Sequence, residues 1–464
     1  MVERDGRTHQ KIKTTPPSTP IAHSPITSKG YTSSKYPTSN RPGPSGSFVT
    51  YSQSAADAGE IMVTPDWSWH NWFSSLWARL TADPAVAFAL TVFFTHRLLL
   101  FALGAFFAPF VPQVPPLGAS LLRDVDPRHW GPSFFLLAPW QRWDTNWYIH
   151  IAQSGYAIGD GTTNYPPLYP LGVAVLGRML LEQYMLAAIL ISNLAYIFAL
   201  VYFYRLCNRL FNVEVTRRAI LLLATFPTAF FLLSGYTESL YLALVLAAFY
   251  YAEETRWWPV IILTILASLT RLQGIILIAP LAYIYLQKRQ FNWHNWRKMI
   301  TREGVALAAL PPVGLGLYLA YVYFILGDFN FNNHLAVVWH VKFALPWETF
   351  FGGLVGFFDP NNAHNLIYNV MDLILLVVFV CLIIIWAQRK LPMAYLIYSV
   401  LSMLVFLTRQ GVDGFFWMSL NRYVLAIFPV FMLAGLIAPR YLIKVSAAVQ
   451  AIWVVLFIFW MWAG

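Results

Sequence analysis

The feature that most constrains this chain is a series of long apolar runs that starts near residue 84 and continues to residue 462. One α-helical crossing of a bilayer needs about 20 mostly apolar residues. Only 11% of the 464 residues are charged, against roughly 25% in a soluble domain. We therefore expect an all-α polytopic integral membrane protein. The runs are residues 84–111, 184–204, 217–234, 237–252, 257–270, 272–287, 303–326, 368–387, 392–408, 421–438 and 441–462.

The first part of the chain has a different composition. Residues 1–62 are rich in Ser, Thr, Pro and Gly, carry scattered Lys and Arg, and contain almost no large aliphatic side chains. Such a segment cannot bury enough apolar surface to fold, so we predict a disordered, basic cytoplasmic tail. Tryptophans and leucines recur at helical spacing in residues 66–82, which is typical of an interfacial amphipathic helix. Residues 84–464 then form the transmembrane domain.

The distribution of positive charge selects one topology. With a cytoplasmic tail, no crossing at 167–181 and two crossings in 257–287, the chain has about 11 transmembrane helices. Of the 31 Lys and Arg residues, 22 then fall on the cytoplasmic side and 8 on the opposite side, as the positive-inside rule expects. Residues 112–183 and 327–367 become two large outer loops, which are expected to contain helices. The net charge of +10 is thus explained by the membrane, without a nucleic-acid partner.

In this topology, ionisable residues that interrupt apolar runs gather on the extracytoplasmic side. Each also fits an ordinary role: Arg271 could snorkel to the interface, and Asp144 or Glu238 could cap a helix. Ionisable groups at membrane depth are nevertheless candidates for function. The six residues are Asp144, Glu238, Arg271, Arg409, Asp413 and Arg422.

The first outer loop carries the most informative motif, WDTNWYIHIAQSGY at residues 143–156. Its pattern predicts a short helix with Asp144 and Tyr148 as neighbours, since residues i and i+4 share one face. A carboxylate among tryptophans at the edge of a bilayer is costly to maintain. Service as the general base for a substrate that is half lipid would account for that cost.

Four ordered motifs resemble those of the PIG-V-like mannosyltransferases, and the resemblance runs from about residue 85 to 440. They are RWDTNWYIHIAQSGY with NYPPLYPL (142–171), PTAFFLLSGYTESLYLAL (227–244), SLTRLQGIILIAP (268–280) and SLNRYVLAIFPVF (419–431). The resemblance implies the glycosyltransferase C architecture, a multi-helix enzyme with an outward-facing site.

The family also implies a chemistry. The donor is a sugar, foremost mannose, on a polyprenyl or dolichyl monophosphate. Asp144 is the expected catalytic base, and direct displacement inverts the anomeric carbon. Arginine suits phosphate because its planar charge offers paired donors, so Arg271 and Arg422, followed by Arg409, are the expected phosphate-binding residues.

The remaining candidates would hold the sugar or the acceptor, or support the site. They are Glu238, Asp160, Trp143, Trp147, Tyr148, His150 and Tyr165. The aromatic residues could equally anchor at the interface, and His150 could be a packing residue. We expect no cofactor and no metal, and treat Asp124 and Asp126 as a loop feature.

Several alternatives stay open. The same scaffold could move a different lipid-phosphate-linked sugar. The chain could instead be a secondary transporter, although such proteins tend to show inverted repeats, or a non-catalytic partner subunit. The acceptor could be a lipid, a glycan or a protein. The membrane could be the bacterial plasma membrane or the endoplasmic reticulum, with the site on the extracytoplasmic or lumenal side.

Overall fold

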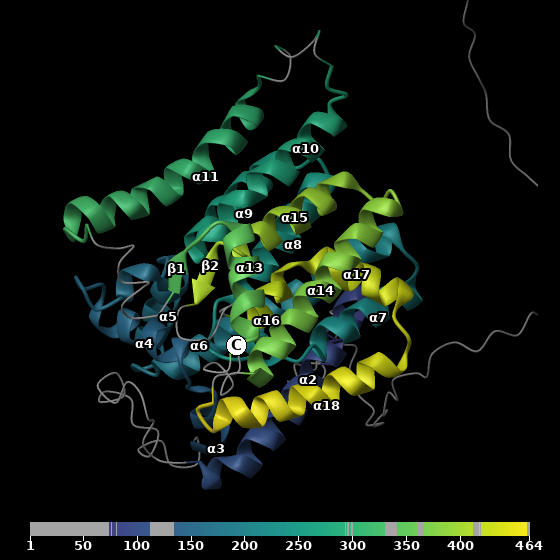
Figure 1. Cartoon of the computed structure of the whole chain (residues 1–464). Helices are drawn as coiled ribbons and strands as arrows, with labels where there is room; N and C mark the ends of the chain where they lie inside the picture. Colours follow the sequence, from purple (N-terminus) through teal and green to yellow (C-terminus); the bar gives the residue numbers. More distant parts are fainter. Residues whose placement is uncertain are drawn as a thin grey trace, which may run out of the picture. The chain divides into compact units, whose positions relative to one another are not determined.

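The computed structural model is almost entirely helical in the part of the chain that it describes (Figure 1). Residues 1–62 and 112–133 lie outside it, and so does most of 66–82, where Ser74, Ser75 and Trp77–Arg79 are helical. The fold class predicted from the sequence, an all-α polytopic membrane protein, is confirmed. The described residues are 74–75, 77–79, 81–111, 134–292, 294, 297, 300–329, 341–359, 366–411, 417 and 419–461.

Five described helices are long and apolar enough to cross a membrane, judged by length and composition. A sixth span is possible where α16 (Leu420–Tyr423), with the turn after it, meets α17 (Phe428–Ile437) at a bend of 84°. The number of eleven crossings stays a prediction. The five candidates are Pro84–Phe110, Tyr184–Leu210, Arg302–Ile325, Leu366–Gln388 and Tyr441–Ile458, which contain α2 (Pro84–Phe107), α6 (Tyr184–Leu210), α11 (Arg302–Ala320), α14 (Leu366–Gln388) and α18 (Tyr441–Ile458).

Other predicted crossings correspond to shorter helices. Helix α8 (Glu238–Glu253) has 16 residues, while α9 (Trp257–Thr270) and α15 (Met393–Phe406) have 14 each. At about 1.5 Å per residue, such helices are shorter than a hydrocarbon core of about 30 Å. The run 257–287 breaks at Arg271, as the two-crossing reading expects, and continues as the 3₁₀ turn η6 (Leu272–Leu277) and α10 (Ile278–Lys288).

Helices α6 and α8 form the centre of the core. Helix α6 contacts α2, α8, α5 (Leu168–Met179) and α7 (Val213–Ala224). Small residues let some of these helices approach closely, as is usual in membrane proteins. A Cβ atom added to Gly435 of α17 would stand 2.7 Å from the backbone oxygen of Val215 in α7. This contact fixes α17, and the bend before it, against α7.

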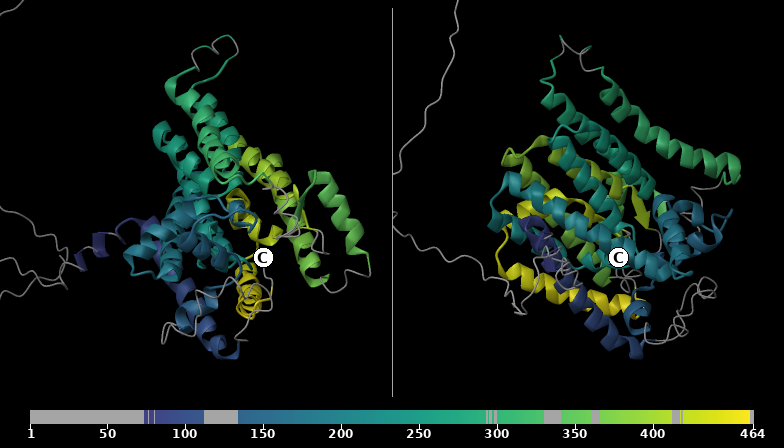
Figure 2. Two further views of the ribbon diagram at one scale, coloured as in Figure 1. Left: turned by 90° about the vertical axis from the view of Figure 1, so that its left-hand side faces the viewer. Right: turned by 180° about the vertical axis from the view of Figure 1, so that it is seen from behind.

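A two-stranded ribbon joins two distant connections. Strand β1 (Val341–Phe343) pairs antiparallel with β2 (Arg409–Gly411), and Phe343 is opposite Arg409. Helix α13 (Pro346–Phe357) follows β1 and contacts β2. The ribbon, α13 and the neighbouring α15 are labelled in Figure 1, and Figure 2 shows the chain from the side and from behind.

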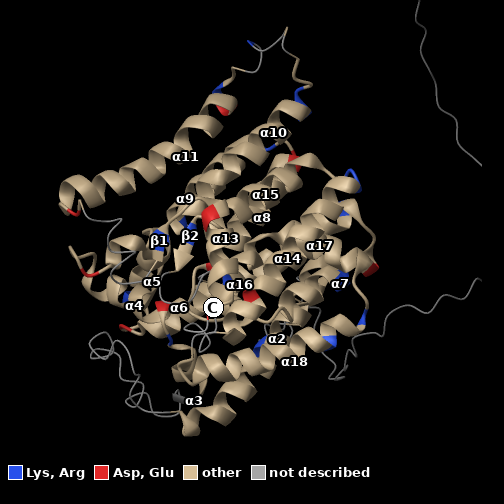
Figure 3. Cartoon of the chain, in the orientation of Figure 1, with Lys and Arg blue, Asp and Glu red and all other residues tan. Residues whose placement is uncertain are grey.

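Charged residues are sparse along the helices. Figure 3 shows most of the ribbon without Lys, Arg, Asp or Glu, and the coloured positions lie mainly at helix ends and connections. One example is Asp83, which accepts a hydrogen bond from the backbone N of Ala85 at 2.8 Å and so caps α2. Its other oxygen lies 2.7 Å from Arg205 of α6. The same carboxylate therefore starts one helix and joins it to another.

Candidate active site

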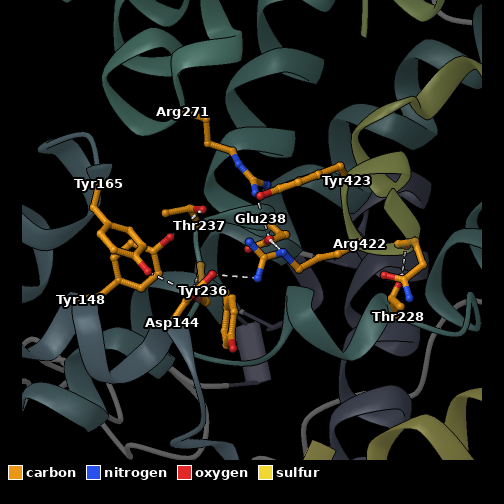
Figure 4. Close-up of polar contacts among 12 residues, drawn as sticks. Asp144, Tyr148, Tyr165, Thr228, Tyr236, Thr237, Glu238, Arg271, Arg422 and Tyr423 are labelled. Carbon is orange, nitrogen blue, oxygen red and sulfur yellow. Dashed lines mark hydrogen bonds and ion pairs between the residues drawn. The ribbon is translucent and has the colours of Figure 1, made fainter. Parts of the chain in front are cut away.

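Asp144 is the first residue of α4 (Asp144–Ser154), which the motif at 143–156 predicts. Its carboxylate is buried, yet it faces a cavity. Oδ2 lies 2.7 Å from Arg422 Nη1, and Oδ1 accepts a hydrogen bond of 3.1 Å from the hydroxyl of Tyr165 (Figure 4). Trp143, with φ of 49°, occupies the N-cap position, and no side chain caps the helix. The Asp144 carboxylate therefore makes contacts with residues distant in the sequence and does not cap its own helix.

Behind this pair lies a second carboxylate, Glu238, which does not line the cavity. Its Oε1 lies 2.9 Å from Arg422 Nε and 3.2 Å from Arg271 Nη2 (Figure 4). The Arg271 contact is a hydrogen bond, whereas the Arg422 Nε–H direction does not meet hydrogen-bond geometry and the contact is an ion pair only. Four charges thus alternate in sign in the order Asp144, Arg422, Glu238, Arg271.

Burial makes this row of charges significant. The side chains of Arg422 and Glu238 are 5% and 2% exposed, and that of Arg271 is 10% exposed. A buried charge that loses its partner is strongly destabilising. Glu238 is the first residue of α8, and Thr237 holds the N-cap position. The Glu238 side chain therefore contacts the two guanidinium groups and does not cap α8, although its negative charge is favourable near the N-terminus of that helix.

The backbone near Arg422 is shaped by several long-range contacts. Ser419, with φ of 62°, precedes the four-residue helix α16. The backbone N of Asn421 donates to Asp372 of α14 at 3.3 Å, and its carbonyl oxygen accepts from Thr228 at 2.6 Å. These contacts hold α16 from two sides. They fix the direction in which Arg422 leaves the chain.

Arg271 stands at a forced break in the chain. Helix α9 ends at Thr270, and the next turn packs back against it. A Cβ atom on Gly274 would stand 2.3 Å from the backbone N of Ser268, so only glycine fits there. Arg271 is consequently extended, with φ of −148°, and its guanidinium lies 4.9 Å from the centre of the Tyr423 ring. A ring face favours a cation at this distance.

An aromatic wall lies opposite the arginines. The Trp147 and Tyr165 rings stack with centroids 5.9 Å apart, and the Tyr148 ring meets the edge of Tyr165 at 5.0 Å. Burial raises the pKa of Tyr165 well above its ordinary value, and the negative charge of Asp144 raises it further. Tyr165 therefore stays protonated at neutral pH and can keep donating to Asp144.

The cavity between these walls has a volume of about 330 Å³. Asp144, Tyr148 and Tyr165 line one side, and Arg271, Arg422 and Tyr423 line another. The β1–β2 ribbon adds Lys342 and Arg409. Arg409 Nη1 donates to the Tyr423 hydroxyl at 2.7 Å. Lys342, Tyr423 and Thr237 are lining residues that the sequence interpretation did not assign to the site.

Some predicted site residues lie apart from the cavity. Asp160 accepts hydrogen bonds from the backbone and hydroxyl of Thr162, at 2.8 and 2.6 Å, and so caps its own turn. His150 Nε2 lies 4.0 Å from the same carboxylate. Trp143 packs edge-on against Trp460, with ring centres 6.1 Å apart. None of the three lines the cavity, so their predicted contact with sugar or acceptor stays a prediction without geometric support.

Three predicted positions fall elsewhere. Asp413 of the outward-facing charges, and the loop residues Asp124 and Asp126, lie outside the described residues. Within the described part of the chain, no three His, Cys, Asp or Glu side chains are grouped as metal ligands.

Comparison with known proteins agrees with the motif-based resemblance. Residues 133–330 match the family model of mannosyltransferase (PIG-V), which confirms the predicted relationship. GPI mannosyltransferase 2 of Schizosaccharomyces pombe is 23% identical over 252 residues, 52% of this chain and 53% of that protein. The chain thus matches about half the length of this curated relative.

A solved structure is also similar. The crystal structure of ArnT from Cupriavidus metallidurans, bound to undecaprenyl phosphate, superposes with a TM-score of 0.42 at 16% sequence identity. The similarity covers 80% of this chain and 60% of ArnT.

Proposed function

We propose that this chain, which matches the PIG-V mannosyltransferases over residues 133–330, is a lipid-phosphate-sugar dependent glycosyltransferase. In this proposal it transfers a sugar, foremost mannose, from a polyprenyl or dolichyl phosphate to an acceptor hydroxyl. The reaction inverts the anomeric carbon and takes place at the extracytoplasmic or lumenal face of the bacterial plasma membrane or endoplasmic reticulum. The acceptor is a lipid, a glycan or a protein.

The observation that carries the proposal is the position of the Asp144 carboxylate. It lines the cavity and is held at Oδ2 by Arg422 and at Oδ1 by Tyr165. Each carboxylate oxygen can accept two hydrogen bonds, so Oδ1 retains one position for an incoming hydroxyl. A general base must lie within hydrogen-bond reach of the proton that it removes, and a fixed carboxylate in a cavity meets this requirement.

The proposed reaction is a single displacement. The acceptor hydroxyl gives its proton to Asp144 while its oxygen forms a bond to the anomeric carbon. The bond between that carbon and the phosphate oxygen breaks, and its electron pair leaves with the lipid phosphate. Negative charge therefore grows on the phosphate, where Arg271, Arg409 and Arg422 would stabilise the transition state more than the ground state.

The aromatic wall supports the assignment of a sugar site. Tyr148 and Tyr165 line the cavity on the side of the base, and Trp147 stacks behind Tyr165. Rings of this kind present apolar faces with polar edges, which suits the mixed surface of a sugar. The same wall would place the anomeric carbon between Asp144 and the cations.

The charge row explains why Glu238 belongs to the proposed machinery without contacting substrate. It contacts Arg422 and Arg271 from behind the cavity surface. We assign it as a positioning residue, since it fixes both guanidinium groups and offsets their charge.

The outward orientation rests on two observations. The charge bias favours the topology with Asp144 outside. Of the six charged residues that interrupt apolar runs on the predicted outer side, four line one cavity, and Glu238 contacts two of these four. The sixth, Asp413, lies outside the described residues. Participation in one site is a reason for charged residues that interrupt apolar runs to occur on the same side of the membrane.

The direct test uses Asp144→Asn with radiolabelled polyprenyl-phosphate mannose, glucose and pentose in turn. We expect wild-type protein to transfer mannose, and Asp144→Asn to lose about 10²- to 10⁴-fold in kcat, the usual contribution of general base catalysis. Donor binding should be retained, and the melting temperature should fall by less than in Arg422→Gln, because Arg422 keeps Glu238 as a partner. Glu182→Gln, an exposed carboxylate away from the cavity, is the matched control. Full turnover in Asp144→Asn would remove the base assignment, and no transfer from any donor would reject the function.

A further inference from the structure

The cations around the cavity fall into two groups with different partners. Arg422 contacts two carboxylates, Asp144 and Glu238, and Arg271 contacts Glu238. Two guanidinium groups thus share two carboxylates, and their charges offset one another. The positive charge of Arg271 and Arg422 is therefore balanced by carboxylates of the protein itself.

The second group lies on the β1–β2 ribbon. Arg409 donates to the Tyr423 hydroxyl, and no ion pair joins it to a carboxylate within the described residues. Its Nε is buried without a hydrogen-bond partner there. Lys342 lines the same cavity, its side chain is exposed, and no described carboxylate lies within ion-pair distance. The ribbon therefore brings two positive charges that no carboxylate of the described residues offsets.

We infer that Lys342 and Arg409 form the phosphate subsite of this cavity, with Lys342 as its mobile member. The inference rests on the proposed function. Arginine gives a planar donor pair whose position is fixed by Tyr423. Lysine is a compact charge on a flexible stem, and so can follow a headgroup as it arrives and leaves.

The charge of the reacting phosphate fits a pair of cations. In the donor, the phosphate is a diester with one negative charge. After transfer it is a monoester, whose charge approaches −2 at neutral pH because its second pKa is near 6. One charge is gained as the glycosidic bond breaks. Two free cations match the product and the transition state better than the donor, which is the condition for raising kcat.

Arg422 and Arg271 then contribute less to the phosphate than the two cations of the ribbon, and they have an additional role. Because their charges are offset by carboxylates, they set the position of the base and border the sugar end of the cavity. The ribbon draws one cation from the connection before α13 and the other from the connection after α15. The phosphate subsite therefore depends on strand pairing as much as on single residues.

The test compares two lipids that differ only in charge. Binding of polyprenyl monophosphate and of uncharged polyprenol is measured in nanodiscs, for wild type, Lys342→Gln, Lys342→Arg and Lys444→Gln. We expect Lys342→Gln to weaken polyprenyl monophosphate binding about tenfold, as expected for one lost charge-assisted contact. Polyprenol binding should be unchanged. Lys342→Arg should recover most of the loss, and Lys444→Gln, an exposed position on α18 away from the cavity, should behave as wild type.

Turnover gives an independent measure. Lys342→Gln should lower kcat about tenfold in mannose transfer, because the charge that it balances grows in the transition state. Arg409→Gln should do the same, and the melting temperature of Lys342→Gln should match wild type. If wild type transfers sugar but Lys342→Gln binds polyprenyl monophosphate and turns over normally, the subsite is wrong and the function stands. If wild type transfers nothing, the proposed function fails, and equal binding of both lipids by wild type and Lys342→Gln then overturns the subsite as well.

Discussion

Two pairs of buried arginines in this protein have different partners. Arg97 donates to the carbonyl oxygen of Leu233 at 2.8 Å, and Arg142 donates to those of Ala138, Gln141 and Ile458 at 2.6 to 2.9 Å. Arg271 and Arg422 instead contact carboxylates. Arg97 and Arg142 join segments of chain through backbone carbonyl groups, which do not ionise. Arg271 and Arg422 contact carboxylates, which can gain or lose a proton, and both arginines line the cavity.

The difference separates the arginines of the proposed site from the other two. Burial does not separate the pairs, since Arg97 and Arg142 are 6% and 4% exposed and Arg422 is 4% exposed. Aromatic contact does not separate them either. The guanidinium of Arg97 lies 3.7 Å from the centre of the Phe101 ring, while Arg271 lies 4.9 Å from that of Tyr423. An ionisable partner and access to open space distinguish the site.

The largest effect is expected from Arg422→Gln. It leaves Asp144 and Glu238 buried without their shared cation, and breaking a buried pair in this way costs about 3–5 kcal/mol. Thermal unfolding in detergent should show a large loss of stability, and transfer should be abolished. The double variant Asp144→Asn/Arg422→Gln should regain part of the melting temperature and none of the activity. A double variant no more stable than Arg422→Gln alone would contradict an ion-pair role.

A smaller effect, on stability alone, is expected from Arg97→Met. The change removes the 2.8 Å donor of the Leu233 carbonyl oxygen, which keeps the longer contact of 3.4 Å from Asn193 Nδ2. A hydrogen bond from a charged group contributes about 1.5–3 kcal/mol. The melting temperature should fall, while kcat per folded molecule should stay at the wild-type value. A fall in kcat without a fall in melting temperature would place Arg97 in the site and erase the contrast between the two pairs.

The smallest effect is expected from Asp160→Asn. Asp160 accepts hydrogen bonds from Thr162 in its own turn, and an asparagine oxygen can accept the same bonds. We expect stability within about 1 kcal/mol of wild type and transfer within about twofold. A tenfold loss of kcat/KM would show that this carboxylate belongs with Asp144 after all.

The features of the site that the sequence predicted are those that depend on residues close together in the chain. The α4 helix, its Asp144–Tyr148 neighbours and the break at Arg271 each follow from residues close together in the chain. Arg422 was predicted as a phosphate ligand, and the structure shows it bound to Asp144. Its charge and motif were evident, but its partner depends on contacts that no local pattern encodes.

Lys342 illustrates why the remainder was not predicted. It is a single lysine in a connection between helices, with no motif around it. Only the pairing of Lys342 with Gln410 in the ribbon brings it to the cavity. The reverse holds for His150 and Asp160, which are near Asp144 in sequence but lie outside the cavity. Proximity along the chain therefore does not place these two side chains at the cavity, and their proposed role stays a prediction.

The contact between Asp144 and Arg422 joins residues 278 positions apart. At a synthesis rate of about 5–20 residues per second, the acid waits on the order of half a minute for its guanidinium to leave the ribosome. A nascent chain that contains α4 but not yet α16 lacks the arginine partner of this acid, so the carboxylate must be hydrated or protonated in the interval. Assembly of the Asp144–Arg422 contact is therefore among the later events in the biosynthesis of the protein, and a chain released before α16 is made lacks this contact even when its early helices have folded.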